Sequence, residues 1–327
     1  MIDKIINGIN YRLNEENLTA EVIQKEGYEG DIIIPEIVVF EEVAYRVTSI
    51  GKEAFRSCFS LTSIVIPDSV TSIGEWAFYN CSSLTSIVIP DSVTSIGEEA
   101  FHCCRSLTSI VIPDSVTSIG KRAFSGCKSL TSMVVAEGNT VYDSREQCNA
   151  IIHTATNTLI SGCQSTIIPE SVTSIGESAF SHCSSLTSVV IGNGVTSIGG
   201  GAFSDCSSLT SVVVAEGNTV YDSREQCNAI IHTATNTLIR GCQNTIIPDS
   251  VTSIGESAFR GCSSLTSIVI PDSVTRIGKD AFCACSSLTS ITFSGTKAQW
   301  NRIKLGNDWK YDVPTKVIHC TDGDVKR

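Results

Sequence analysis

The sequence is poor in charged residues and has no excess of basic ones. Charged residues make up 17% of its 327 positions, and 34 Asp and Glu outnumber 23 Lys and Arg, which gives a net charge of −11. Nucleic acids and anionic membrane surfaces are bound through clustered Lys and Arg, so neither is an expected partner. No apolar run approaches the ~20 residues of a membrane-spanning helix, so membrane insertion is not expected either.

Motifs of known chemistry are also missing. There is no GxSxG elbow, HExxH helix, P-loop or GxGxxG after a strand. The glycine run Gly199–Gly201 in "SIGGGAF" fits a repeat corner better than a phosphate-binding loop, because the flanking strand and helix are absent. Histidine is scarce, and His153 and His232 are copies of each other, so neither is a unique catalytic base. We expect no enzyme, no catalytic residue, no metal site and no cofactor.

Cysteine, by contrast, is abundant and regularly spaced. The chain has 15 cysteines but no CxxC-to-CxxC zinc pattern. Most recur at a 23-residue step, so each is expected to stack on its copy in the next structural unit. A free cysteine is small, apolar and easily buried, which predicts a buried, reduced ladder. The predicted ladder consists of Cys58, Cys81, Cys104, Cys127, Cys183, Cys206, Cys262 and Cys285.

Internal repeats account for most of the chain. Short units of the form IPDSVTSIGxxAFxxCxSLTSIV begin at Ile66, Ile89, Ile112, Ile168, Ile191, Ile247 and Ile270. A variant unit near Ile34 carries the insertion "EIVVFEEVAYR". Longer units lie near 134–167 and 213–246, and the block 134–190 recurs 79 residues later as 213–269. Such duplication is typical of a modular array.

One unit predicts a coil that turns several corners. "LTSIVIP" reads as the main strand, ended by a proline that cannot donate to a ladder. "VTSI" reads as a second short strand, and "GEEAFHCC" is short enough to be only a turn or a 3₁₀ fragment. A single coil cannot bury its apolar side, so stacked neighbours must form the core. The inward side chains are expected to include Phe78, Phe101, Phe124, Phe180, Phe203, Phe259 and Phe282.

The predicted fold class is therefore a repeat solenoid, rich in parallel β-strands with little α-helix, occupying residues 31–292. Its open ends need caps. Residues 1–30 are expected to form a hairpin cap around the polar turn Asn14–Asn17. Residues 293–327 are expected to form a helix and strand cap, in which Thr296 and Gln299 match a capping box and Trp300 covers the last coil.

These units resemble the leucine-rich repeats of the BspA-like surface proteins, whose consensus is similar to LxxIxIPxxVxxIGxxAFxxCxxL. The match covers about residues 31–292. The resemblance implies a leucine-rich-repeat solenoid on a cell surface, in a family associated with adhesion to host proteins or other cells. The N-terminal sequence does not match a secretory signal, and no membrane anchor or cell-wall sorting sequence is recognised in the given sequence. A cell-surface or secreted location is thus implied only by the resemblance, and a cytoplasmic one stays open.

Two surfaces are candidates for binding. The first is the repeated strand side, with rows such as Thr85, Ser86 and Val88, bordered by one acidic residue per coil. That row consists of Asp68, Asp91, Asp114, Glu170, Asp249 and Asp272, and Asn193 interrupts it. It favours a cationic partner or Ca²⁺, although a solvated row that keeps the edge soluble is the simpler interpretation. The second surface is the variable corner, which carries residues such as Trp76 and Tyr79.

One cluster has a chemical alternative. Cys148, His153 and Cys163 flank a predicted hairpin that turns near residues 155–156, and Cys227, His232 and Cys242 are the twin cluster. With a two-residue turn, Cys148 faces Cys163, as in a disulfide or a soft-metal site. We favour two core cysteines, because a metal site would require further ligands.

The sequence predicts a non-catalytic binding or adhesion protein that presents an extended repeat face to a protein or glycan. The alternatives are a passive structural spacer and a binder of a regular lattice or polysaccharide through its Thr and Ser rows.

Overall fold

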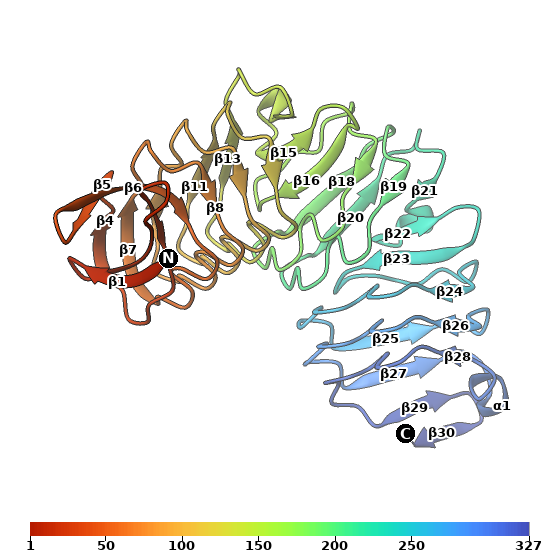
Figure 1. Cartoon of the computed structure of the whole chain (residues 1–327). Helices are drawn as coiled ribbons and strands as arrows, with labels where there is room; N and C mark the ends of the chain where they lie inside the picture. Colours follow the sequence, from red (N-terminus) through yellow and green to blue (C-terminus); the bar gives the residue numbers. More distant parts are fainter. Residues whose placement is uncertain (327) are drawn as a thin grey trace. The chain divides into compact units, whose positions relative to one another are not determined.

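The computed structural model describes residues 1–326, and these divide into two compact units, Met1–Thr166 and a second unit that begins at Ile167. Both are built mainly from short strands, and the described residues contain a single α-helix, of four residues. Figure 1 shows the strands of each unit stacked side by side. Repeated parallel pairing confirms the predicted β-rich repeat solenoid. This division does not test the expected boundaries between caps and solenoid near residues 30 and 292, which stay predictions.

The first unit begins with an antiparallel meander and continues as parallel stacks. One sheet has the order β1-β2-β3-β6-β8-β10-β12, with β5 beside β6, and the main strands form the sheets β4-β7-β9 and β11-β13. The strands are β1 (Ile2–Ile6), β2 (Ile9–Asn14), β3 (Thr19–Val22), β4 (Glu29–Ile33), β5 (Ile37–Phe40), β6 (Val43–Ile50), β7 (Ser60–Val65), β8 (Ser72–Ile73), β9 (Ser86–Ile87), β10 (Ser95–Ile96), β11 (Ser109–Ile112), β12 (Ser118–Ile119), β13 (Ser132–Val135), β14 (Tyr142–Asp143), β15 (Ala150–His153) and β16 (Thr158–Gly162), with a 3₁₀ turn at Arg145–Gln147.

The second unit repeats this plan. Its sheets are β17-β19, β18-β20, β21-β22-β23-β24-β26-β28 and β25-β27-β29-β30. The elements are β17 (Ser174–Ile175), β18 (Ser188–Ile191), β19 (Ser197–Ile198), β20 (Ser211–Val214), β21 (Tyr221–Asp222), β22 (Ala229–His232), β23 (Thr237–Gly241), β24 (Ser253–Ile254), β25 (Ser267–Ile270), β26 (Arg276–Ile277), β27 (Ser290–Phe293), α1 (Lys297–Trp300), β28 (Lys304–Leu305), β29 (Val317–Cys320) and β30 (Gly323–Lys326), with a second 3₁₀ turn at Arg224–Gln226.

The segment from the glycine of each repeat to its cysteine, such as Gly97–Cys104, is here called the corner. Its backbone N–H groups donate to carbonyls of the next coil: Trp76 to Glu98 at 2.9 Å and Asn80 to His102 at 2.7 Å. Both donors have positive φ, 56° and 58°. Such a conformation is costly for a residue with a side chain, and the inter-coil hydrogen bonds offset that cost. The glycine is needed for close approach, because a Cβ on Gly97 would lie 2.4 Å from the Glu75 nitrogen.

Phenylalanine rings fill the interior behind the corners. Phe55, Phe78, Phe101 and Phe124 form a continuous stack with centroid separations of 5.1, 5.2 and 5.4 Å. Phe180 stacks on Phe203, and Phe259 on Phe282, in the second unit. All eight rings are buried. The 23-residue repeat therefore places identical rings one above another in nearly parallel planes, and each coil depends on its neighbours for its core.

Both ends of the chain differ from the repeat. β1, β2 and β3 pair antiparallel, and β3 then pairs parallel with β6. At the other end, the Thr296 side chain accepts from the Gln299 N–H and the Gln299 side chain bonds the Thr296 backbone. This is the capping box expected from the sequence. Trp300 is fully buried and packs edge-on against Phe293. That these pieces act as caps stays a prediction.

Replacing Phe101 by Ala tests the ring stack. We expect the free energy of unfolding to fall by about 3–5 kcal/mol, because a buried ring is lost and the coils above and below cannot close the cavity. Denaturant titration measures this change. Replacing the exposed Phe59 by Ala is the control, and a loss below about 1 kcal/mol for Phe101→Ala would contradict the burial described here.

Candidate binding surfaces

An exposed aliphatic side chain recurs at the main-strand position of most coils, and the last coil has Thr292 there, opposite Val269. The exposed fraction of the aliphatic side chains ranges from 41% at Val134 to 78% at Val88. In the first unit, this aliphatic row consists of Ile33, Val65, Val88, Val111 and Val134; in the second, of Ile167, Val190, Val213, Ile246 and Val269. Ile33 lies opposite Val65, and Val111 opposite Val134, in the parallel registers. Neighbouring strands lie about 4.8 Å apart, so the row forms a narrow apolar stripe in the first unit. In the second unit the long unit interrupts it, because Asn228 accepts from both the Val212 N–H and the Thr245 hydroxyl and so lies between the coils of Val213 and Ile246.

Threonine and serine flank this stripe. Thr85 and Ser86 are exposed, as the sequence predicted. The Thr85 hydroxyl donates to the Thr62 carbonyl of the preceding coil at 3.3 Å, and Thr131 does the same to Thr108. The hydroxyl protons of this row are therefore used within the protein. What the row offers a partner is mainly methyl groups and oxygen lone pairs.

The acidic row lies three residues after the aliphatic row along the chain, with Asn193 in place of an acid after Val190. The structure places Asp68, Asp91, Asp114, Glu170, Asp249 and Asp272 on the surface. Within residues 1–326, none of these carboxylates has a hydrogen bond or ion pair. Elsewhere, acids are paired, as Glu75 is with Lys52 at 3.1 Å and Asp143 with Arg145 at 2.6 Å. The row is thus an array of uncompensated negative charge in each unit.

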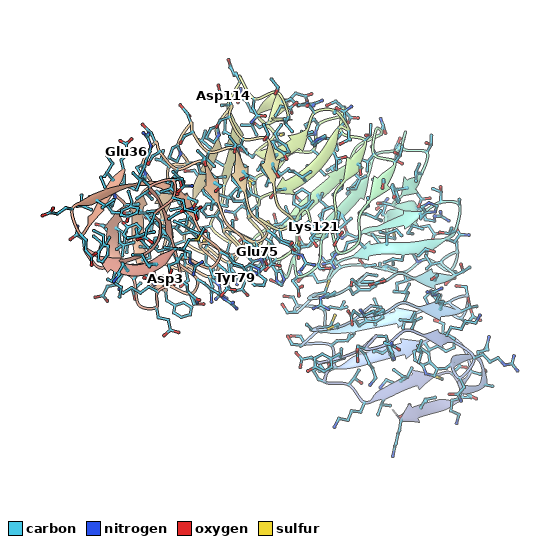
Figure 2. All side chains as sticks on the ribbon, viewed as in Figure 1. Asp3, Glu36, Glu75, Tyr79, Asp114 and Lys121 are labelled. Carbon is cyan, nitrogen blue, oxygen red and sulfur yellow. The ribbon has the colours of Figure 1, made fainter. Side chains whose placement is uncertain are left out.

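The corners of the first unit form a different surface. Lys52 Nζ lies 4.6 Å from the centroid of the Trp76 ring, and Arg56 lies over both Trp76 and Tyr79. Tyr79 stacks in turn on His102 at 5.1 Å. Figure 2 shows Tyr79, Glu75 and Lys121 on the edge of this unit opposite to Asp114. The two candidate surfaces are therefore separated, and the ring faces at the corner are already covered by neighbouring coils.

The cluster of Cys148, His153 and Cys163 lies on the predicted hairpin of β15 and β16. His153 pairs with Thr158, but a bulge at residues 151–152 shifts the register, so that Ala150 pairs with Gly162. The predicted direct opposition of Cys148 and Cys163 is therefore wrong, because the bulge adds one residue on the β16 side. The Cys163 thiol donates to the Asn149 carbonyl at 3.3 Å, and Cys148 points toward the Ala150 carbonyl at 3.7 Å. Both are free, buried thiols, and the twin hairpin has the same register.

The predicted cysteine ladder lies entirely in the interior. All fifteen cysteines are free, and the eight of the ladder are buried. The thiols of Cys81, Cys104 and Cys127 donate to the carbonyls of Phe55, Phe78 and Phe101, at 3.0, 3.2 and 3.2 Å. Each thiol thus adds a second donor to a carbonyl of the preceding coil, which already accepts from the N–H of that coil's own cysteine. Burial raises the pKa of Cys104 and takes those of Cys127 and Cys206 to about 12, so these groups stay protonated at neutral pH.

Two features of the surface and interior were not identified from the sequence. The aliphatic row was identified only through Val88, and its isoleucine members at 33, 167 and 246 were missed. The signal was the alignment of "TIIP" with "IVIP", which places Ile167 at the position of Val65. The second is Arg240, a buried guanidinium in β23. In the part of the chain that the structure describes, no three His, Cys, Asp or Glu residues gather as metal ligands, and no helix is long and apolar enough to cross a membrane.

Comparisons with known proteins agree with this geometry. The model described as BspA type Leucine rich repeat region matches residues 48–159, 160–236 and 236–303. A leucine rich cell surface protein from Faecalibacterium prausnitzii is 26% identical, covering 93% of this chain and 98% of its own, with a TM-score of 0.39. A leucine-rich repeat protein from Bacteroides ovatus is 27% identical, covering 95% and 92%, with a TM-score of 0.40. The pneumococcal vaccine antigen PcpA is 18% identical, and the match covers 98% of this chain and 88% of PcpA. Its TM-score of 0.52 shows the same fold. No curated protein matches.

Thiol labelling tests the cysteine ladder. Only Cys103 and Cys320 are partly exposed, so Ellman's reagent at pH 8 should modify at most these two in the native protein and all fifteen in denaturant. Burial raises the pKa of both exposed thiols, which should slow their reaction. Replacing both by Ser should abolish native labelling. Rapid modification of more than two thiols before unfolding would show that the ladder is open to solvent.

Proposed function

The chain belongs to the BspA-type leucine-rich-repeat family, and we propose on that premise that it is a non-catalytic binding protein, which holds a protein or glycan partner against its strand face. The observation that carries the proposal is the aliphatic row beside the acidic row, because it combines an exposed apolar stripe with unpaired charge. Exposed apolar patches rimmed by polar groups are typical of interaction sites. The family resemblance supports a location on the cell surface.

The aliphatic row supports binding by repetition. One valine side chain contributes little apolar area, at about 25 cal/mol per Å² removed from water. A partner that follows the stripe contacts one such side chain per coil, and the small terms add. The fixed spacing of the strands makes the contacts regular, so an extended or repetitive partner gains most. No single residue is expected to dominate the affinity.

The acidic row supports a cationic partner. Its carboxylates are exposed and have no cation of their own within the described chain, so approach of Lys or Arg groups neutralises them. Such charge complementarity mainly accelerates association and selects the partner. It is screened within about 8–10 Å at physiological salt. Binding through this face should therefore weaken as salt concentration rises.

The placement of the histidines supports a non-catalytic role. His153 contacts the Thr156 hydroxyl at 3.0 Å, and His232 contacts Thr235 at 3.1 Å, in the turns of the two twin hairpins. His319 lies 2.9 Å from Asp324 in the exposed terminal hairpin. Each is on a separate element. Within the described chain, His153 and His232 contact a threonine hydroxyl but no orienting carboxylate, and His319 contacts a carboxylate but no nucleophile, so none of the three completes a nucleophile, base and orienting group. These contacts are better explained as local stabilisation of turns.

Matched variants on the two edges of the first unit test this proposal. A partner is first identified by screening immobilised glycans and extracellular-matrix proteins. Replacing Asp68, Asp91 and Asp114 together by Ala should then weaken its affinity about fivefold to thirtyfold, at roughly 0.3–0.7 kcal/mol per charge, and flatten the salt dependence. Replacing Trp76 and Tyr79 by Ala should change it less than twofold. The reverse pattern would place binding on the corners, and the absence of any partner would favour a passive spacer.

A further inference from the structure

The second long unit interrupts the hydrogen-bond ladder of the corners. In the coil before it, the N–H groups of Ser178 and Phe180 donate to the next coil. In the coil after it, those of Ser257 and Phe259 do the same. The equivalent donors of the intervening corner belong to Gly201 and Phe203. The long unit has no corner to receive them, and within residues 1–326 neither N–H has an acceptor.

Arg240 lies beside this interruption, because it lines the same cavity as Gly201 and Phe203. Its side chain is only 3% exposed. Nη1 donates to the carbonyls of Arg260 at 3.1 Å and Ser257 at 3.4 Å, and Nη2 contacts the Cys262 thiol at 3.6 Å. Nε is fully buried and has no partner. The next residue is necessarily glycine, because a Cβ on Gly241 would lie 2.3 Å from the Phe259 ring.

The charge of Arg240 is not neutralised by the protein. Within the described chain, it forms no ion pair with a carboxylate. The neighbouring Arg260 differs, because it pairs with Asp205 at 3.4 Å and Asp280 at 3.2 Å. Nor do the adjacent thiols supply a negative charge: burial raises the pKa of Cys262, and that of Cys206 to about 12. An unpaired buried charge is strongly destabilising, so a counter-ion would relieve a real energetic cost.

A cavity of about 210 Å³ adjoins this guanidinium. Its walls include the three glycines 199–201, Phe203, Arg240 and, at the rim, Glu256. One water occupies about 30 Å³, so there is room for a small ion with some of its hydration. The lining thus combines the Gly201 and Phe203 backbone with the Arg240 side chain, which come from different coils. A tetrahedral oxyanion presents acceptor oxygens in several directions and suits both.

We propose that this cavity binds a small inorganic oxyanion of the size of phosphate or sulfate, held by the Arg240 side chain and the free N–H groups of Gly201 and Phe203. The glycine run in "SIGGGAF" then contributes to an anion site. The site arises where the repeat is interrupted and is completed by Arg240, and it does not use a strand–loop–helix motif. The inference does not depend on the proposed strand-face function. The first long unit carries Ser161 where the second has Arg240, so the site belongs to the second copy.

Phosphate titration of the full chain tests the site. Isothermal titration with sodium phosphate, at constant ionic strength set by sodium chloride, should show one saturable site per chain. Arg240→Ser, the residue found in the twin unit, should weaken binding about tenfold or more, the loss expected for hydrogen bonds to a charged group. Arg276→Ser, which removes an exposed arginine of the same unit, should leave the affinity unchanged.

A second pair of variants keeps the test decisive if Arg240→Ser fails to fold, which native thiol labelling would reveal. Glu256→Gln removes the acidic group at the rim and should tighten phosphate binding about twofold to fivefold. Glu98→Gln, at the equivalent exposed position of another coil, should have no effect. Absence of saturable binding, equal affinity in Arg240→Ser, or no response to Glu256→Gln would each overturn the proposal and leave an adventitious ion only.

Discussion

The hydrogen bonds from alternate corner N–H groups to carbonyls of the next coil are the constraint on which the regular coils depend. They require left-handed backbone at residues such as Trp76 and Asn80, which only the neighbouring coil can stabilise. They also bring backbones so close that the corner must begin with glycine, as at Gly97. Because the regular coils repeat this geometry, the phenylalanine rings of successive coils stack on one another, and the cysteine thiol of one coil donates to a phenylalanine carbonyl of the preceding coil. The near-identity of the repeats follows from this requirement.

The same requirement explains what the sequence could predict. Residues that recur every 23 positions occupy equivalent places, so the interior positions of Phe101 and Cys104 and the exposed position of Asp91 could be predicted from spacing alone. The opposition of Cys148 and Cys163 could not, because the bulge in the β15–β16 hairpin depends on packing rather than pattern. The burial of Arg240 could not be predicted, because a single arginine among polar residues is normally exposed. Its burial depends on the interruption of the corner ladder, which only the structure shows.

Regularity and interruption have different consequences for function. Regular coils expose the same side chains again and again, which gives the aliphatic and acidic rows their length and favours weak contacts summed along a partner. Interruptions of the repeat create local environments that the regular coils do not have. Where the second long unit omits its corner, the N–H groups of Gly201 and Phe203 lose their acceptors and a buried guanidinium lines the same cavity. The two proposals thus place an extended binding face on the regular coils and a local ion site at the interruption.

Deleting one whole coil tests the central claim most directly. Removal of residues 89–111, which is one 23-residue period, joins Val88 to Ile112 and leaves every remaining corner opposite a complete neighbour. The shortened chain should unfold cooperatively in denaturant and keep its remaining ladder thiols protected from Ellman's reagent. Removal of residues 89–100, which is half a period, should expose those thiols and abolish the cooperative transition. If the two deletions behave alike, the stacking register does not determine the fold, and the account is wrong.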